Sequence, residues 1–158
     1  KRLGLQPRRT IRVVLWTNEE NGLRGGTAYR DAHAAELSKH VLAMESDGGV
    51  FAPEGFSVDG SDEAVAVMRG LAPLLEPIGA TNIRAGGAGA DVGPLTAAGV
   101  PGLGLQVDGT RYFWYHHSDA DTMDKLDPRE MAQCVAAMAV MAYVVADMPE
   151  TLPRRAPR

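Results

Sequence analysis

Apolar residues along the chain fall into short continuous runs and into longer stretches with a spacing of three and four residues. The short runs lie at residues 10–17, 40–44, 55–58 and 102–107, and they predict strands. Residues 10–17 (TIRVVLWT) are nearly continuous in apolar and β-branched character, which is typical of a strand covered on both faces. We therefore predict that this segment lies centrally in a sheet.

The longer stretches predict three helices. Residues 27–37 are rich in alanine, and residues 62–78 carry a core-facing apolar stripe directly after Ser61, a residue suited to cap a helix. The last helix begins after Asp127, which is followed by a proline and then by a glutamate, as in well-capped helices. It is expected to end at Pro149.

The order of these elements predicts an α/β fold. A strand, a helix and a second strand over residues 10–44 indicate a right-handed crossover between parallel strands. We expect one domain over residues 1–148, with a mostly parallel mixed central sheet and helices on both faces. The chain opens almost directly on a strand without an initiator methionine, so we expect a piece of a longer protein whose sheet is incomplete at the N-terminus. Residues 149–158, rich in Pro and Arg, are expected to form a solvated end or a linker.

Composition excludes several classes of function. The 158 residues carry a formal charge of −4, and this argues against a general nucleic-acid or anionic-membrane partner, which requires a clustered positive field. The longest apolar run, residues 134–146, is shorter than the ~20 residues needed to span a bilayer and predicts a buried helix. A single cysteine, Cys134, excludes an internal disulfide, and its place on an apolar helical stripe disfavours covalent catalysis.

Acidic residues follow two of the predicted strands. Glu19 and Glu20 come after the first strand, and Asp47 comes after the second, with Glu45 two residues earlier as a lesser candidate. Because carboxyl ends of parallel strands share one sheet edge, we expect these side chains to lie close together. One carboxylate of the Glu pair is suited to bind a metal while the other takes a proton from bound water. The alternatives are an acidic turn before a helix and an Asp in a glycine turn.

Two imidazoles and two carboxylates occur together in the segment HHSDADT, residues 116–122. Neutral imidazole and carboxylate are ligands that zinc, manganese and cobalt accept, so His116 and His117 are candidate ligands. Asp121 is suited to accept a hydrogen bond from a metal-bound histidine. The alternative is a solvated histidine pair on a surface loop, and His33 and His40 are interpreted as structural.

The glycine-rich segment GGAGAD, residues 86–91, predicts a flexible loop. A dinucleotide-binding motif that starts at Gly87 would need a third glycine at position 92, which is Val92, and no phosphate-loop lysine follows. Dinucleotide binding is therefore poorly supported. The glycines either let the backbone approach a substrate or only turn the chain.

Four motifs in this order resemble one known family. VVLWTNEENGLRGG, AMESDGG, GAGADVGPLTAAGVPGLGL and YFWYHHSDADTMDKLDP are similar to segments of the zinc aminopeptidase and glutamate carboxypeptidase family of co-catalytic metallopeptidases. The likeness extends over nearly the whole chain, from Arg8 to Pro153. The Glu-Glu pair followed by His-x-x-x-Asp-Thr is fairly specific, whereas either half alone would be weak.

The resemblance implies roles for individual residues. Glu19 would be the general base, Glu20 a metal ligand, and Asp47 a ligand of a second metal. His117 would complete the site of the first metal, because it stands four residues before Asp121-Thr122, as the family's ligand does. Three further positions are expected to act behind these ligands or on the substrate: Asp91, His116 and Asp121.

The resemblance also implies two Zn²⁺ ions per complete site and hydrolysis of short peptides to amino acids, in a secreted or periplasmic protein. Two ligands of the family, a His in a His-x-Asp segment and an Asp that bridges both metals, have no counterpart in this sequence. The chain alone is therefore expected to bind zinc weakly. We also expect a homodimer. The alternative function is a non-catalytic binding domain that keeps this fold without metals.

Overall fold

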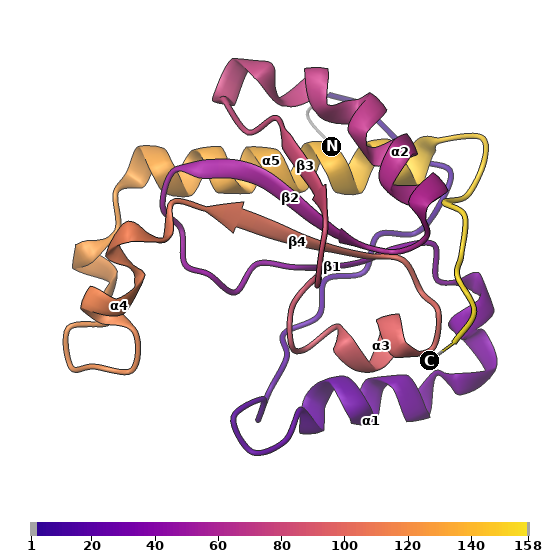
Figure 1. The fold of residues 1–158 in the computed structure, drawn as a ribbon, viewed down its shortest axis with the longest axis horizontal. Coiled ribbons are helices and arrows are strands. Elements are labelled where there is room, and N and C mark those ends of the chain that lie inside the picture. Colours follow the sequence, from indigo (N-terminus) through magenta and orange to yellow (C-terminus); the bar gives the residue numbers. More distant parts are fainter. Residues whose placement is uncertain (1–2, 158) are drawn as a thin grey trace.

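The structure is a computed structural model that describes residues 3–157, and its centre is one mixed sheet (Figure 1). The strands are β1 (Ala43–Glu45), β2 (Pro53–Asp59), β3 (Asn82–Ala85) and β4 (Gly102–Val107), in the order β1-β4-β2-β3. The pairs β1–β4 and β2–β3 are parallel, and β2–β4 is antiparallel. The predicted α/β fold with a mixed, mostly parallel sheet is confirmed.

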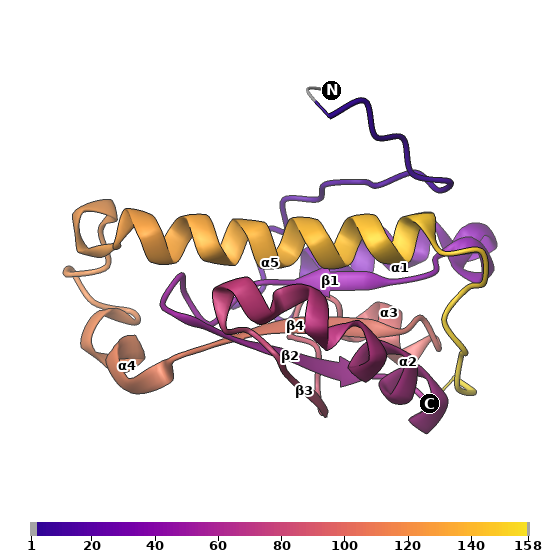
Figure 2. The same cartoon turned by 90° about the horizontal axis from the view of Figure 1, so that it is seen from above.

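Five α-helices surround the sheet in the described part of the chain: α1 (Arg24–Ala32), α2 (Asp62–Leu71), α3 (Gly93–Ala97), α4 (Tyr112–Tyr115) and α5 (Pro128–Asp147). Short 3₁₀ turns follow α1 at Ala34–Lys39 and α2 at Ala72–Ile78, and two more lie at Gly109–Arg111 and Met123–Lys125. In Figures 1 and 2, α2 and α5 lie on one side of the sheet and α1 and α3 on the other.

The two best-signalled helices begin where the sequence predicts. Ser61 Oγ accepts a hydrogen bond from the Ala64 amide at 3.2 Å, and the Asp127 carboxylate accepts bonds from the first two free amides of α5. The helix predicted over residues 62–78 is α2 followed by a 3₁₀ turn. This change of geometry begins just before Pro73, which has no amide hydrogen to continue the α-helical ladder.

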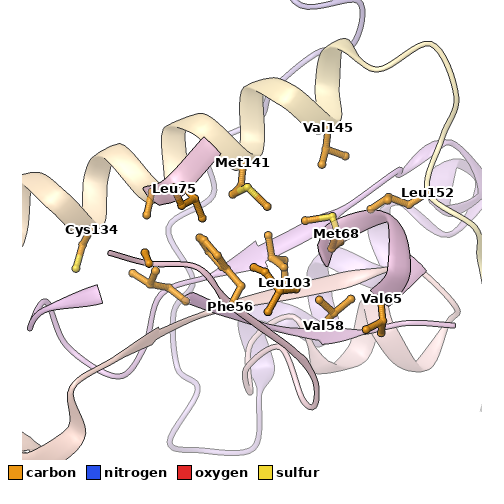
Figure 3. Close-up of a cluster of buried hydrophobic side chains, with 14 residues drawn as sticks. Phe56, Val58, Val65, Met68, Leu75, Leu103, Cys134, Met141, Val145 and Leu152 are labelled. Atoms are coloured by element: carbon orange, nitrogen blue, oxygen red, sulfur yellow. The ribbon is translucent and has the colours of Figure 1, made fainter. Parts of the chain in front are cut away.

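Among residues 3–157, the core consists of two apolar clusters that lie on opposite faces of the sheet. The larger cluster joins α2 and α5 to β2 and β4, with Phe56, Met68, Leu103 and Met141 fully buried (Figure 3). The second cluster lies beneath α1 and α3 and is formed by Ala43, Ala88, Val92, Leu95 and Val100. Burial of such side chains is the main source of the free energy of folding.

The central strand predicted at residues 10–17 is wrong for the described chain. This segment is extended but pairs with no strand, and Val13 and Leu15 are 85% and 87% exposed. Trp16 packs against the second core cluster, where its ring contacts Tyr29 edge-on at a centroid distance of 5.4 Å. A strand needs a partner for its backbone hydrogen bonds, and no described segment supplies one. The predicted parallel crossover from this segment to β1 is therefore wrong as well.

The tail at residues 149–157 is mostly exposed, as expected for a solvated end, but individual side chains anchor it to the domain. Leu152 is only 2% exposed and belongs to the larger core cluster. Arg154 donates to the His40 carbonyl at 2.8 Å, and Arg155 forms an ion pair with Asp59 at 2.5 Å. A proline- and arginine-rich composition does not prevent a segment from packing when individual side chains find partners on the domain.

Helix α5 is the one described helix that is long and apolar enough, by length and composition alone, to cross a membrane. Its inward face carries Cys134, Ala137, Met141 and Val145, which belong to the larger core cluster. The predicted helix and its one buried face are confirmed, but Val135, which lies in the run predicted to be buried, is 60% exposed. Cys134 donates its thiol hydrogen to the Phe51 carbonyl at 3.1 Å, and burial raises the pKa of this thiol, in agreement with an inert cysteine.

Candidate active site

Glu20 and His117 are 97 positions apart in the sequence and meet in the structure. His117 Nε2 lies 2.8 Å from Glu20 Oε1. Both side chains are largely exposed, 61% for His117 and 68% for Glu20. His117 has a φ of 54°, an uncommon conformation for a residue other than glycine, and it precedes the tight turn at Ser118. The structure thus brings together two of the predicted site residues.

Glu19 is held by the turn that leads into α1. Its carbonyl accepts hydrogen bonds from the amides of Gly22 and Leu23, at 2.9 and 2.8 Å. Burial raises the pKa of the Glu19 carboxyl, the charges of Glu20, Asp91 and Asp47 raise it further, and His117 opposes them. Glu19 thus lies in a field of negative charge contributed by three separate segments of the chain.

Asp47 is exposed and follows β1 by two residues. Its negative charge contributes to the raised pKa values of Glu19, Asp91 and Tyr112, so it lies within electrostatic range of all three. Glu19, Glu20 and Asp47 thus lie within electrostatic range of one another, but within residues 3–157 they form no group close enough to hold a metal ion, so their convergence stays a prediction. Glu19 and Glu20 follow an unpaired segment and not a strand.

Asp91 lies in the loop formed by residues 86–92, which crosses the sheet above β4. Burial raises the pKa of the Asp91 carboxyl, with a further contribution from Asp47. Its Oδ1 atom is buried and has no hydrogen-bond partner among the described residues. A buried carboxylate oxygen without a partner is unfavourable, which indicates that an additional polar or cationic group completes this region.

Two glycines in β4 allow the loop to lie flat on the strand. A Cβ atom at Gly104 would lie 2.4 Å from the Ala88 carbonyl oxygen, and one at Gly102 would lie 2.6 Å from Ala88 Cβ. Sequence reasoning missed this role. The signal was the alternation GLGL at residues 102–105, since glycines two apart on a buried strand mark a face where another backbone approaches closely.

The aromatic helix α4 supplies one wall of the site. Tyr112 stacks on His116 with ring centroids 4.5 Å apart, and His116 in turn stacks on His117 at 3.8 Å. Burial raises the pKa of the Tyr112 hydroxyl, and Asp47, Glu20 and Asp121 add to this effect. His116 therefore packs against one face of the His117 ring.

Asp121 lies on the exposed loop near Tyr112. Its amide donates to the Ser118 carbonyl at 3.0 Å, which closes a turn after the histidine pair. Within residues 3–157, His117 is hydrogen-bonded to Glu20 and not to Asp121. The expected hydrogen bond between Asp121 and His117 is therefore not formed in this structure.

A cavity of about 350 Å³ lies beside these groups. Its acidic wall is formed by Glu45 and Asp47, its aromatic wall by Tyr112 and Phe113, and its floor includes Gly104. Most small-ligand sites combine an apolar lining with a few convergent polar groups, as this cavity does. His33 and His40 lie elsewhere, against Tyr29, in agreement with their structural interpretation.

The types of side chain in this region suit a divalent cation such as zinc, which binds imidazole and carboxylate. Unbalanced negative charge around Glu19 and the unpartnered Asp91 Oδ1 favour such a cation. Among residues 3–157, however, no three His, Cys, Asp or Glu side chains are arranged closely enough to hold one. The side chains in this region are therefore of the types that bind zinc, but too few of the described ones lie close together to hold an ion.

An α/β sheet with a carboxylate–imidazole cluster at its rim is typical of hydrolases that use metal ions. Comparison with known proteins identifies the particular group: residues 1–142 match the family model of Peptidase family M28. The chain belongs to this family, and the resemblance drawn from the four motifs is confirmed.

The chain is similar to carboxypeptidase Q from several vertebrates. It is 48% identical to the mouse protein and 46% identical to the human protein, in each case over 154 residues, which are 98% of this chain and 33% of the relative. It is also similar to the crystal structure of a peptidase M28 precursor from Shewanella amazonensis SB2B, with a TM-score of 0.90 and 40% identity over 98% of this chain and 35% of that one. The chain thus spans about a third of the length of these relatives.

Proposed function

We propose that this chain carries part of the active site of a dinuclear zinc metallo-exopeptidase that hydrolyses dipeptides or short peptides. The observation that carries the proposal is the contact between Glu20 and His117, at 2.8 Å and directly beside Glu19. A hydrogen bond between a carboxylate and an imidazole that are both largely exposed is weak by itself. Because Asp47 and Asp91 contribute negative charge to the same region, the position of this hydrogen bond supports Glu20 and His117 as ligands of one metal ion.

Glu20 and His117 would hold one zinc ion and Asp47 the other. Membership of the family and similarity to carboxypeptidase Q support these assignments. Bound zinc supplies Lewis acidity, which lowers the pKa of a water molecule and polarises a peptide carbonyl. Glu19 would accept the proton of that water and transfer it to the leaving amine, a role for which a carboxyl with a raised pKa is well suited.

The cavity beside Asp47 would bind the substrate. Its size admits a short peptide side chain, with Tyr112 and Phe113 as the apolar wall. Phe113 is 82% exposed, so a bound peptide would cover an aromatic surface that otherwise faces water.

We further propose that the remaining metal ligands come from polypeptide outside these 158 residues, in a secreted or periplasmic homodimer. The incomplete donor set, the unpaired segment at residues 10–17 and the length of the relatives support the first part of this proposal. Sedimentation of the complete polypeptide tests the dimer.

Two variants of the complete polypeptide test the function. Glu19→Gln is expected to retain two zinc equivalents and to lose hydrolysis of dipeptides by at least ~10²-fold, because a general base contributes that much. His117→Ala is expected to lose zinc and hydrolysis together. His33→Ala is the matched control, since this histidine is also on the surface but contacts Tyr29.

Full hydrolysis by Glu19→Gln would remove the proposed role of Glu19. A parent protein that folds, binds no zinc and hydrolyses no peptide would instead support the non-catalytic binding domain. Zinc content is measured by atomic absorption and hydrolysis by release of free amino acids.

A further inference from the structure

Glu45 is a buried acid beside the site, and neither the family comparison nor the proposed chemistry uses it. It is the last residue of β1 and lies two positions before Asp47. Only 6% of its surface is exposed. Its Oε2 atom accepts a hydrogen bond from the Val92 amide at 2.9 Å, while Oε1 has no partner among residues 3–157.

The loop at residues 86–92 passes directly over this carboxylate. Gly89 has a φ of 133°, and a Cβ atom built on it would lie 2.3–2.6 Å from the three carboxyl atoms of Glu45. Only glycine tolerates both this backbone conformation and this distance. The sequence GGAGAD thus brings the backbone against Glu45, and the loop is not merely a turn of the chain.

The two ends of the loop are held by different side chains. At its start, Ser57 Oγ donates to the Gly87 carbonyl at 2.5 Å. At its end, the Glu45 carboxylate accepts a hydrogen bond from the amide of Val92, the residue that follows Asp91. The backbone of Asp91 also lies against α1, where a Cβ at Gly26 would be 2.2 Å from the Asp91 carbonyl oxygen.

Stability alone does not explain a carboxylate at this position. Removal of a charged group from water is unfavourable, and one hydrogen bond to an amide offsets only part of that free energy. An apolar residue at the end of β1 would extend the adjacent cluster of Ala43, Val92 and Leu95 without this penalty. A buried acid here therefore calls for a role other than stabilisation of the core.

We propose that Glu45 is a positioning residue: by binding the Val92 amide it fixes residues 86–92 over β4 and thereby holds Asp91 within electrostatic range of Glu19 and Asp47. The proposal rests on the proposed peptidase function for its effect on catalysis, but the mechanical part stands on the contacts alone. Glu45 borders the cavity beside Asp47, but with only 6% of its surface exposed its proposed role is to hold the loop and not to react with the substrate.

Two substitutions at Glu45 in the complete polypeptide test this inference. Glu45→Ala removes the acceptor and is expected to raise amide hydrogen exchange in residues 86–92 by ~10-fold or more, because a hydrogen bond to a charged group is lost. It is also expected to lower kcat for dipeptide hydrolysis by roughly 10-fold, with KM and zinc content nearly unchanged. Glu45→Gln keeps a carbonyl acceptor for Val92 and is expected to restore both exchange protection and kcat.

Val65→Ala is the control for general destabilisation, because Val65 is buried in the other core cluster. It should lower the melting temperature without a selective change in loop exchange. Unchanged exchange in Glu45→Ala, or Glu45→Gln as impaired as Glu45→Ala, would overturn the proposal. The exchange measurement requires no catalysis, so a parent protein without hydrolytic activity would refute the proposed function and leave the test of Glu45 valid.

Discussion

The two sides of the site are built in opposite ways. On the sheet side, the loop at residues 86–92 lies on β4, where two glycines make room for it, and covers the Glu45 carboxylate at the end of β1. On the other side, Glu20 and His117 project from loops, are more than half exposed, and are joined by a single hydrogen bond. The first arrangement is fixed by the core, and the second depends on one contact in water.

This difference separates the part of the site whose geometry the fold determines from the part whose geometry depends on a bound ligand. A buried half-site is preorganised, because its rotamers and backbone are determined by packing. An exposed carboxylate–imidazole pair contributes little to stability, so its geometry must be completed by whatever it binds. Changes on the sheet side should therefore alter stability, whereas changes on the exposed side should alter only binding and catalysis.

The largest effect on stability is expected from Gly104→Ala. The new Cβ would lie 2.4 Å from the Ala88 carbonyl oxygen, so either the loop or β4 must shift. Such overpacking costs about 1–3 kcal/mol, measured as the free energy of unfolding in urea. Gly70→Ala is the matched control. A Cβ at Gly70, in α2, meets nothing within 4 Å, and alanine is favoured in helices, so stability should stay equal or rise.

If Gly104→Ala were as stable as Gly70→Ala, the close approach of the loop to β4 would not exist. The sheet side would then be no more preorganised than the exposed side.

The next largest effect is a dependence of the free energy of unfolding on pH that is caused by Glu45. Burial raises the pKa of its carboxyl above the ordinary value of 4.5. The folded state therefore binds the proton more tightly than the unfolded state. This contribution to stability is complete below pH 4.5 and is lost as the pH rises through the higher folded pKa. Glu45→Gln lacks this dependence, so its stability relative to the parent should increase between pH 4 and pH 7.

Glu63→Gln provides a control of opposite sign. Hydrogen bonds to its own backbone amide and to Ser61 lower the pKa of the Glu63 carboxyl. The stabilising contribution of Glu63 is thus present above its ordinary value and is lost as the pH falls. Urea titrations of both variants at pH 4 and pH 7 make the measurement. Parallel trends for the two variants would contradict the burial of Glu45.

The sequence predicts the elements that carry their own local signal. The capped starts of α2 and α5 are correct because Ser61 and Asp127 bind amides within three residues of themselves. The strand at residues 10–17 fails because its partner is not specified locally. β3 was not predicted, because its sequence carries no local signal for a strand. Only Ile83 in it is buried, so it lacks an apolar run and becomes a strand by pairing with β2.

The candidate site shows the same division. Glu20 and His117 were expected together from the resemblance of the motifs, since nothing in the chain between these residues, which are 97 positions apart, indicates that they meet. The role of Glu45 could not be anticipated, because its partner is a backbone amide 47 positions away. Spacing in sequence reveals side chains on one element, whereas the closing of loops over a sheet is a property of the folded chain.

On the exposed side, His117→Ala is expected to change the free energy of unfolding of the metal-free protein by no more than ~0.5 kcal/mol, as for surface residues in general. Its ring is 61% exposed and its bond to Glu20 is screened by water. Chemical denaturation in the presence of a chelator makes the measurement. A larger loss would show that the exposed pair is part of the framework, and the contrast between the two sides would disappear.

The smallest effect is local and tests whether the loop after His117 is ordered at all. Hydrogen bonds from Lys125 and Thr122 lower the pKa of the Asp124 carboxyl to about 2, from an ordinary value of 3.8. Any stabilisation from this group is present above pH 3.8 and is lost as the pH falls through 2. Because the carboxylate is exposed, we expect no measurable change in melting temperature for Asp124→Asn.

An NMR titration of the Asp124 carboxyl carbon should nevertheless give a midpoint near 2, and Lys125→Met should return it toward 3.8. A midpoint near 3.8 in the parent would mean that this loop samples many conformations, and the Glu20–His117 contact would then have no fixed support on the His117 side.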